Sequence, residues 1–210
     1  KKAWQSTNLP EGLPENYTGA GINKIYLYGA NFGGPIFKDK LWFYGSYGIQ
    51  DLGTFGINGL ADNTFLESGY FRLDAQVGKN TRANLFYEYD NKQKWGRTSW
   101  GAAQQAPETL YDQVGPTPIY KAEIEQMFGD LFLNAKIAYT HNTFHLIPRL
   151  GEVPNGGGYL IRDHQPEFYA SGNNSDYNTV RPQTNASFNG NYFAENVLGA
   201  DHEFKFGVDY

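Results

Sequence analysis

The sequence contains no cysteine, which excludes disulfide bonds and thiolate metal sites from its 210 residues. Positive charge is sparse and scattered: no Lys/Arg cluster is longer than the pair at the start, and the formal net charge is -5. A nucleic-acid-binding surface is therefore not expected. No apolar run approaches the roughly 18 residues that a membrane-spanning helix requires.

The sequence also lacks helical periodicity, because Ala, Leu and Met never accumulate at a spacing of 3.6 residues. It contains instead 25 Gly and 10 Pro, and aromatic residues make up 17% of a chain that is only 40% hydrophobic. Gly and Pro favour turns, and aromatic residues favour strands. The composition therefore predicts an all-β fold.

Several segments alternate with a period of two between a mainly apolar and a mainly polar set of residues, as strands with two different faces do. The clearest are 70–77, 82–90, 131–140 and 203–210, and only "GKN" separates the first two. If the apolar side of each strand faces lipid, the charged residues face the lumen of a barrel. The lumen-facing candidates are Arg72, Asp74, Arg82, Glu88, Glu123, Glu125 and Lys136.

Connections between these segments alternate between short and long along the chain. Short ones contain "PIFKDK", "GKN", "FGD" and "LGAD", and we expect long loops near 51–67, 91–118 and 143–182, with residues 1–21 as a further loop. Bacterial outer-membrane barrels have short periplasmic turns, long extracellular loops and strands of about 9 to 11 residues. The pattern predicts about eight antiparallel transmembrane strands within one domain, 1–210.

The stretch "GGPIFKDKLWFYGSYG", residues 33–48, is interpreted as one periplasmic turn with its flanking strands. Pro35 lacks an N–H and is expected to end the first strand, and Asp39 lies in the solvated tip. Trp42, Phe43 and Tyr44 then form an aromatic girdle at the level of the lipid headgroups. Taken alone, the stretch also suits an aromatic-lined core of a soluble β-protein.

This stretch, followed by "ANLFYEYDNKQKWGR", "FLNAKIAYTHNTFHL" and "DHEFKFGVDY", resembles the barrel of Oar-like TonB-dependent outer-membrane receptors. The resemblance extends from about residue 30 to the end. It implies a barrel of roughly 22 strands in the bacterial outer membrane, closed by a plug domain and energised by the inner-membrane TonB complex. The chain begins without Met and has no recognisable plug, so we expect a contiguous part of the barrel wall.

Residues expected in the long loops could contact a transported ligand, because aromatic rings offer stacking surfaces. These candidates are Trp95, Trp100, Tyr111, Tyr159 and Tyr169, together with Phe168 and Tyr177. Partners implied by the resemblance are outer-membrane lipid, the plug, the TonB complex and an unknown ligand. Packing within the loops is the simpler explanation for any single ring.

Enzymatic motifs are absent. His141 and His145 have i, i+4 spacing, but that spacing on a strand does not bring two imidazoles to one ion. His164 and His202 each follow an Asp, which suits a hydrogen-bonded loop contact, and no Ser lies in a nucleophile elbow. The oxygen-rich "NNSDYN" and "LADNTFLES" lack the spacing of an EF-hand loop. We therefore predict no enzyme activity, no metal and no cofactor.

Two other interpretations of the sequence remain open. Eight strands could close a small barrel that acts as a pore, anchor or adhesin, and the terminal aromatic Tyr210 is similar to the end of complete outer-membrane proteins. A soluble carbohydrate-binding β-sandwich would also use many aromatic and Asn residues, and it would cover both faces of its sheets.

Overall fold

The computed structural model describes residues 11–12, 21–56, 60–97, 110–149, 160–161, 170–171 and 176–210. Eight of its strands form one sheet, and a pair of two-residue strands, β7 (Leu160–Ile161) and β8 (Ala170–Ser171), forms another. The large sheet contains β1 (Gly21–Phe37), β2 (Leu41–Phe55), β3 (Ala61–Gln76), β4 (Thr81–Arg97), β5 (Tyr111–Phe128), β6 (Leu131–Pro148), β9 (Tyr177–Val197) and β10 (Ala200–Asp209).

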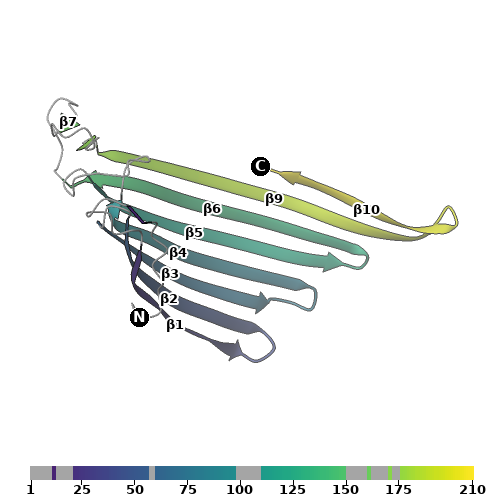
Figure 1. Cartoon of the computed structure of the whole chain (residues 1–210). Coiled ribbons are helices and arrows are strands. Elements are labelled where there is room, and N and C mark those ends of the chain that lie inside the picture. Colours follow the sequence, from purple (N-terminus) through teal and green to yellow (C-terminus); the bar gives the residue numbers. More distant parts are fainter. Residues whose placement is uncertain are drawn as a thin grey trace.

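The eight-stranded sheet is an antiparallel meander in the order β1-β2-β3-β4-β5-β6-β9-β10 (Figure 1). Every neighbour in the sheet is also the next of these strands along the chain, so each pair is a hairpin. β1 and β10 lie at opposite edges, and the sheet is open. The all-β prediction is confirmed. Among the described residues, no helix is long and apolar enough to cross a membrane.

Tight turns join the strands at one end of the sheet, which we call the turn end; the opposite end is the loop end. In the first turn, Lys40 N–H donates to the Phe37 carbonyl at 3.1 Å, and Asp39 has a φ of 61°. Asp39 therefore lies in a turn as expected. Pro35 does not end its strand: it pairs with Trp42, and β1 continues through a bulge to Phe37. An edge strand tolerates proline because one row of its N–H groups has no partner strand.

The strands are longer than the sequence indicated, and the loop bounds expected near 51–67, 91–118 and 143–182 were wrong. β2 reaches Phe55 before β3 begins at Ala61, and β6 reaches Pro148 before β9 begins at Tyr177. The strand ends carry Asp, Asn, Gln and Gly, which propensity assigns to loops. Continuous antiparallel pairing, as in Asp51↔Phe65 and Phe65↔Gln93, supplies backbone hydrogen bonds that outweigh this weak preference.

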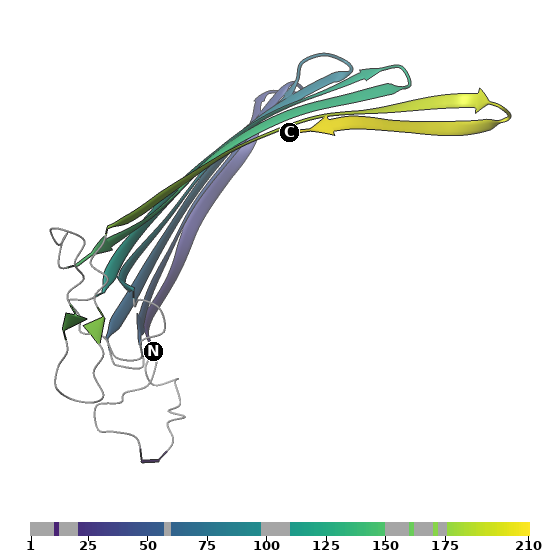
Figure 2. The same ribbon diagram turned by 90° about the horizontal axis from the view of Figure 1, so that it is seen from above.

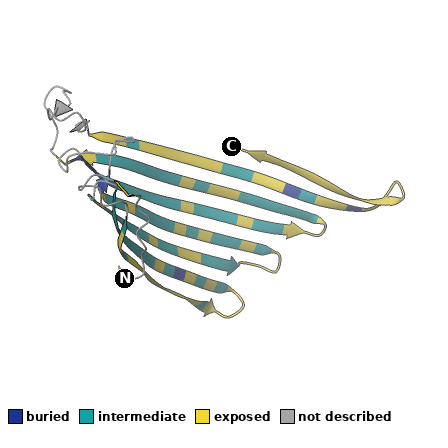
Figure 3. Cartoon of the chain, viewed as in Figure 1, coloured by how far each residue is buried: buried dark blue, intermediate teal, exposed yellow. Residues whose placement is uncertain are grey.

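The described sheet is a single curved layer with no second layer against either face (Figure 2). Only Leu110, Tyr111 and Ala194 are buried hydrophobic residues among the described ones, and most of the sheet is half-buried or exposed (Figure 3). Aliphatic and aromatic side chains such as Leu85 and Ile124 remain about half exposed. A layer of this kind cannot be stabilised by its own core and needs a covering medium or partner.

Aromatic rings lie over glycines of the neighbouring strand at three places on one face. Phe32 covers Gly45, Tyr47 covers Gly69, and Phe206 covers Gly190, and each pair is in direct register. A Cβ added to Gly190 would lie 2.2 Å from the Phe206 ring, against 3.2 Å at Gly45 and 3.5 Å at Gly69. At these places the ring fills the space that the absent glycine side chain leaves.

Candidate functional site

The register brings all seven predicted lumen-facing residues to the same face of the sheet, which we call the polar face. One row across it reads Asp74, Asn84, Glu123, Lys136. Arg82 pairs with Glu125, and the alternation along β3 and β4 adds Arg72 and Glu88. Four strands therefore concentrate charged groups on one face.

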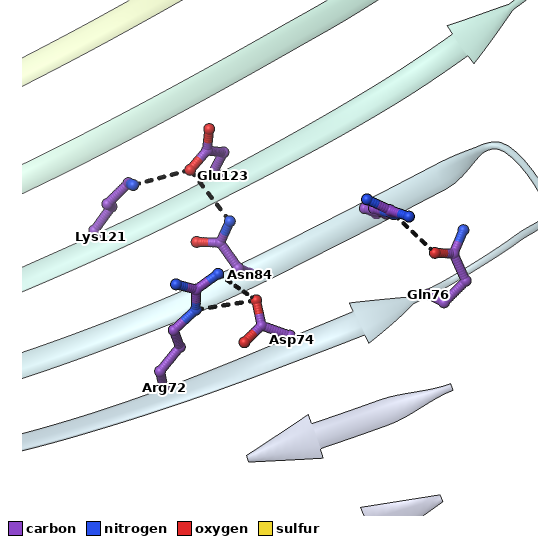
Figure 4. A network of polar contacts seen from close by, with 7 residues as sticks. Arg72, Asp74, Gln76, Asn84, Lys121 and Glu123 are labelled. Carbon is purple, nitrogen blue, oxygen red and sulfur yellow. Dashed lines mark hydrogen bonds and ion pairs between the residues drawn. The ribbon is translucent and has the colours of Figure 1, made fainter. Parts of the chain in front are cut away.

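On the polar face, an ion pair joins Arg72 and Asp74, which are two residues apart on β3 (Figure 4). The Arg72 guanidinium donates through Nε and an Nη to one Asp74 oxygen, at 3.0 and 2.6 Å. Their side chains are 45% and 40% exposed. An ion pair this accessible to water contributes at most about 1 kcal/mol to stability.

Glu123 forms a denser centre beside this pair. Its carboxylate accepts hydrogen bonds from Asn84 at 3.1 Å and Asn134 at 2.8 Å, and Lys121 Nζ lies 2.9 Å away. The Glu123 side chain is only 16% exposed. Asn84, Lys121 and Asn134 were not among the sequence candidates, although the alternation placed Asn84 and Asn134 on the polar side of their strands. The three side chains contact the same carboxylate because of the register in which β4, β5 and β6 pair, and a single sequence does not contain that register.

A groove of about 400 Å³ adjoins this network at the turn end of the polar face. Arg72, Asp74, Arg82 and Glu125 line it together with Trp42. The Arg82 guanidinium donates to the Gln76 amide oxygen at 3.0 Å, which holds it along the groove. The groove therefore presents both signs of charge, as a surface for polar contacts does.

The opposite face, which we call the apolar face, carries a band bounded by two aromatic rows. At the turn end Phe128 pairs with Leu131, which pairs with Tyr192, and Tyr192 pairs with Phe204. Toward the loop end Tyr87, Tyr120 and Tyr139 pair in register. Their ring centroids are 5.0 and 6.4 Å apart. Between the rows the face carries Leu73, Leu85, Ile124, Ile137, Ala83, Ala122, Ala135, Ala186 and Phe188. Thr81 and Gln126 lie next to the turn-end row on the same face, where the Thr81 hydroxyl donates to the Gln126 amide oxygen at 2.6 Å.

The expected girdle of Trp42, Phe43 and Tyr44 is not found as one surface. Trp42 pairs with Asp74 and Tyr44 with Arg72 on the polar face, whereas Phe43 pairs with Leu73 on the apolar face. Three consecutive strand residues cannot face the same side, because successive side chains point to opposite faces. The aromatic rows come instead from residues of different strands.

The predicted ligand-contacting aromatics have different positions in the structure. Trp95 lies within β4 and not in a loop, with a side chain that remains accessible. Tyr111 opens β5 and is 5% exposed, which leaves no surface for a ligand. Tyr177 opens β9 and meets the Phe144 ring edge-on at 6.1 Å. The remaining candidates, Trp100, Tyr159, Phe168 and Tyr169, lie outside the described residues.

Histidines in the described part of the chain make separate, local contacts. His145 Nε2 lies 2.6 Å from Asp176, His141 contacts the Tyr139 hydroxyl at 3.2 Å, and a ring nitrogen of His202 lies 2.9 Å from the Val197 carbonyl. No group of three His, Cys, Asp or Glu side chains suited to a metal occurs within the described ranges. His164 lies outside them.

Comparison of the chain with protein-family models, with curated proteins and with solved structures finds no match.

Proposed function

We propose that this chain forms part of the barrel wall of a TonB-dependent transporter in the bacterial outer membrane. The observation that carries the proposal is the apolar band between two aromatic rows, opposite a face that collects charged groups. Outer-membrane barrels have this sidedness: an apolar belt flanked by aromatic residues outside, and a polar interior. The TonB-dependent assignment is supported by the resemblance of residues 30–210 to Oar-like receptors.

The height of the apolar band fits a bilayer. On β5 the two aromatic rows are at Phe128 and Tyr120, eight residues apart in number. Eight residue steps span roughly 27 Å along a strand, at about 3.4 Å per residue. With a strand tilt of about 40°, the band would be about 20 Å tall, close to the roughly 25 Å belt of outer-membrane barrels. The strands continue past the tyrosine row to Arg97 and Pro148, which we assign to the extracellular side.

In this arrangement the polar face lines the lumen. Arg72, Asp74 and Arg82 would meet the plug through ion pairs and hydrogen bonds that loosen during passage. Their present partners lie within the sheet and are accessible to water, so exchange for partners on a plug is energetically small.

Two features of the sheet favour this function over the other interpretations. The eight strands leave β1 and β10 as separate edges, whereas a small self-contained barrel would pair them. A soluble β-sandwich would cover the apolar face with a second sheet, and the described residues provide none.

Site-directed spin labelling tests the sidedness of the wall. These 210 residues contain no cysteine, so one introduced Cys in this segment can be labelled at a chosen position. In protein reconstituted into lipid vesicles, a label at Leu85→Cys should be relaxed mainly by oxygen, which concentrates in lipid. A label at the adjacent Asn84→Cys should be relaxed mainly by a water-soluble nickel complex. Equal accessibility to both reagents at the two positions would refute a lipid-facing apolar side.

The transporter assignment is tested by the intact polypeptide from its native membrane. We expect a mass several times the 23.6 kDa of this chain, with a plug sequence upstream and further strands downstream. A polypeptide of about 23.6 kDa would instead support a small closed barrel and would remove energised transport from the proposal.

A further inference from the structure

The polar face changes character toward the loop end. A groove of about 550 Å³ lies there, and apolar side chains form much of its wall. Leu27 on β1 is 77% exposed, and Leu66 on β3 and Phe144 on β6 are half-buried. Elsewhere on this face charged and amide groups lie among aromatic rings such as Tyr44, Tyr70 and Phe86, whereas here an aliphatic side chain is largely exposed, which requires an explanation.

One row of the sheet forms the centre of the groove. In register, Leu27 pairs with Gln50, Gln50 with Leu66, Leu66 with Lys92, and Lys92 with Gly115. Because Gly115 has no side chain, the surface is hollow beside Lys92, on the side where β6 contributes Phe144. The row therefore sets an exposed ammonium group between two apolar walls.

Three cations project along β4 at this end, and two of them lack a carboxylate partner. Lys94 is neutralised by Asp62 at 2.9 Å. Arg97 donates to the amide oxygen of Gln113, and its guanidinium lies 5.3 Å from the centre of the Phe144 ring. Among the described residues, neither Lys92 nor Arg97 forms an ion pair with a carboxylate. On the polar face the groove is lined by one cation, Lys92, and one carboxylate, Asp90, and Arg97 beside the Phe144 ring adds a second cation at its margin.

We propose that this groove binds an anionic amphiphile: a small molecule with a carboxylate or phosphate group on an apolar body. The apolar body lies over Leu27, Leu66 and Phe144, and the anion faces Lys92, with Arg97 at the margin. Charge complementarity favours an anion over a neutral sugar, and the apolar walls favour an amphiphile over free phosphate. Gln113, only 4% exposed, anchors Arg97 and so fixes the Phe144 side of the groove. The inference rests on the proposed function insofar as the polar face lines the lumen.

Binding can be measured by titration calorimetry on the full protein in nanodiscs, with 4-phenylbutyrate as the probe and 4-phenyl-1-butanol as its uncharged counterpart. We expect the acid to bind at least fivefold more tightly than the alcohol. Lys92→Gln should weaken binding of the acid at least fivefold, whereas Lys92→Arg, which keeps the charge, should change it less than threefold. Lys205→Gln is the matched control, because Lys205 lies at the far edge of the same face on β10.

Three results would overturn the proposal: no binding of either probe, equal affinity for acid and alcohol, or equal effects of Lys92→Gln and Lys205→Gln. The first is expected if another segment of the protein occupies the groove. The spin-label measurement at Leu85 and Asn84 separates this proposal from the preceding one. Lipid exposure at Leu85 without probe binding refutes the groove alone, and binding without lipid exposure refutes the membrane wall alone.

Discussion

The cost of a charge at the centre of the apolar band gives a quantitative test of what covers this face. Ile124 lies midway between the aromatic rows, four residues from Phe128 and four from Tyr120 on the same strand. Its side chain is 48% exposed, so an Arg fits without displacing a packed core. In a bilayer, Ile124→Arg should destabilise the protein by about 2 to 4 kcal/mol. Since about 1.4 kcal/mol is a factor of ten, the folded-to-unfolded ratio should fall roughly 30- to 1000-fold.

Two matched variants test whether this cost depends on the position of the charge within the band and on the face that carries it. Phe128→Arg places the same charge at the margin of the band and should cost only about 0 to 1 kcal/mol, because the penalty falls toward the interface. Asn185→Arg places it on the polar face at an exposed position of β9 and should stay within about 0.5 kcal/mol of the wild type. Guanidinium unfolding in lipid vesicles, followed by tryptophan fluorescence, measures all three. Equal costs at Ile124 and Asn185 would refute the assignment of the apolar face to lipid.

Three further predictions concern the sheet itself, and equilibrium unfolding measures each. Glu123→Ala should cost about 1 to 3 kcal/mol, because three donors lose a largely buried acceptor; no loss would contradict the network. Arg72→Ala should cost less than about 1 kcal/mol in the absence of a plug, and a larger loss would show that the ion pair is covered. Gly190→Ala should cost about 1 to 3 kcal/mol because it collides with Phe206, whereas Gly34→Ala, which meets open space, should be nearly neutral.

Much of the fold could be predicted from the sequence because several strands, such as β3, β4 and β6, alternate between an apolar and a polar set of residues. The period of two separates the faces without knowledge of the partner strand, which is why all seven charged candidates lie on one face. The same rule, applied to Trp42, Phe43 and Tyr44, would have shown that they cannot form a common girdle. Strand ends were harder, since residues such as Asp51 and Asn91 are poor strand formers that long-range pairing keeps in the sheet.

The sites depended on register, which a single sequence does not contain. Glu123 meets Asn134 because β5 and β6 pair with one particular offset, and Tyr87 reaches Tyr139 only through Tyr120. The groove at the loop end was missed for the same reason: Leu27, Leu66 and Lys92 are far apart in the chain and adjoin only after β1, β2, β3 and β4 pair. Trp95 and Tyr111 were expected in a loop and belong to strands β4 and β5, because their pairing with neighbouring strands could not be read from the sequence.

The glycines beneath aromatic rings bear on how such a sheet avoids misassembly. A slip of one residue between strands would exchange the two faces and is opposed by every charged group, but a slip of two residues keeps the faces correct. It would, however, move Phe206 from Gly190 to Phe188 or Tyr192 and leave the glycine uncovered. The same holds for Phe32, which would leave Gly45 for Phe43 or Tyr47. These pairs therefore favour the native strand register over registers shifted by two residues, which the alternation of apolar and polar residues alone does not distinguish.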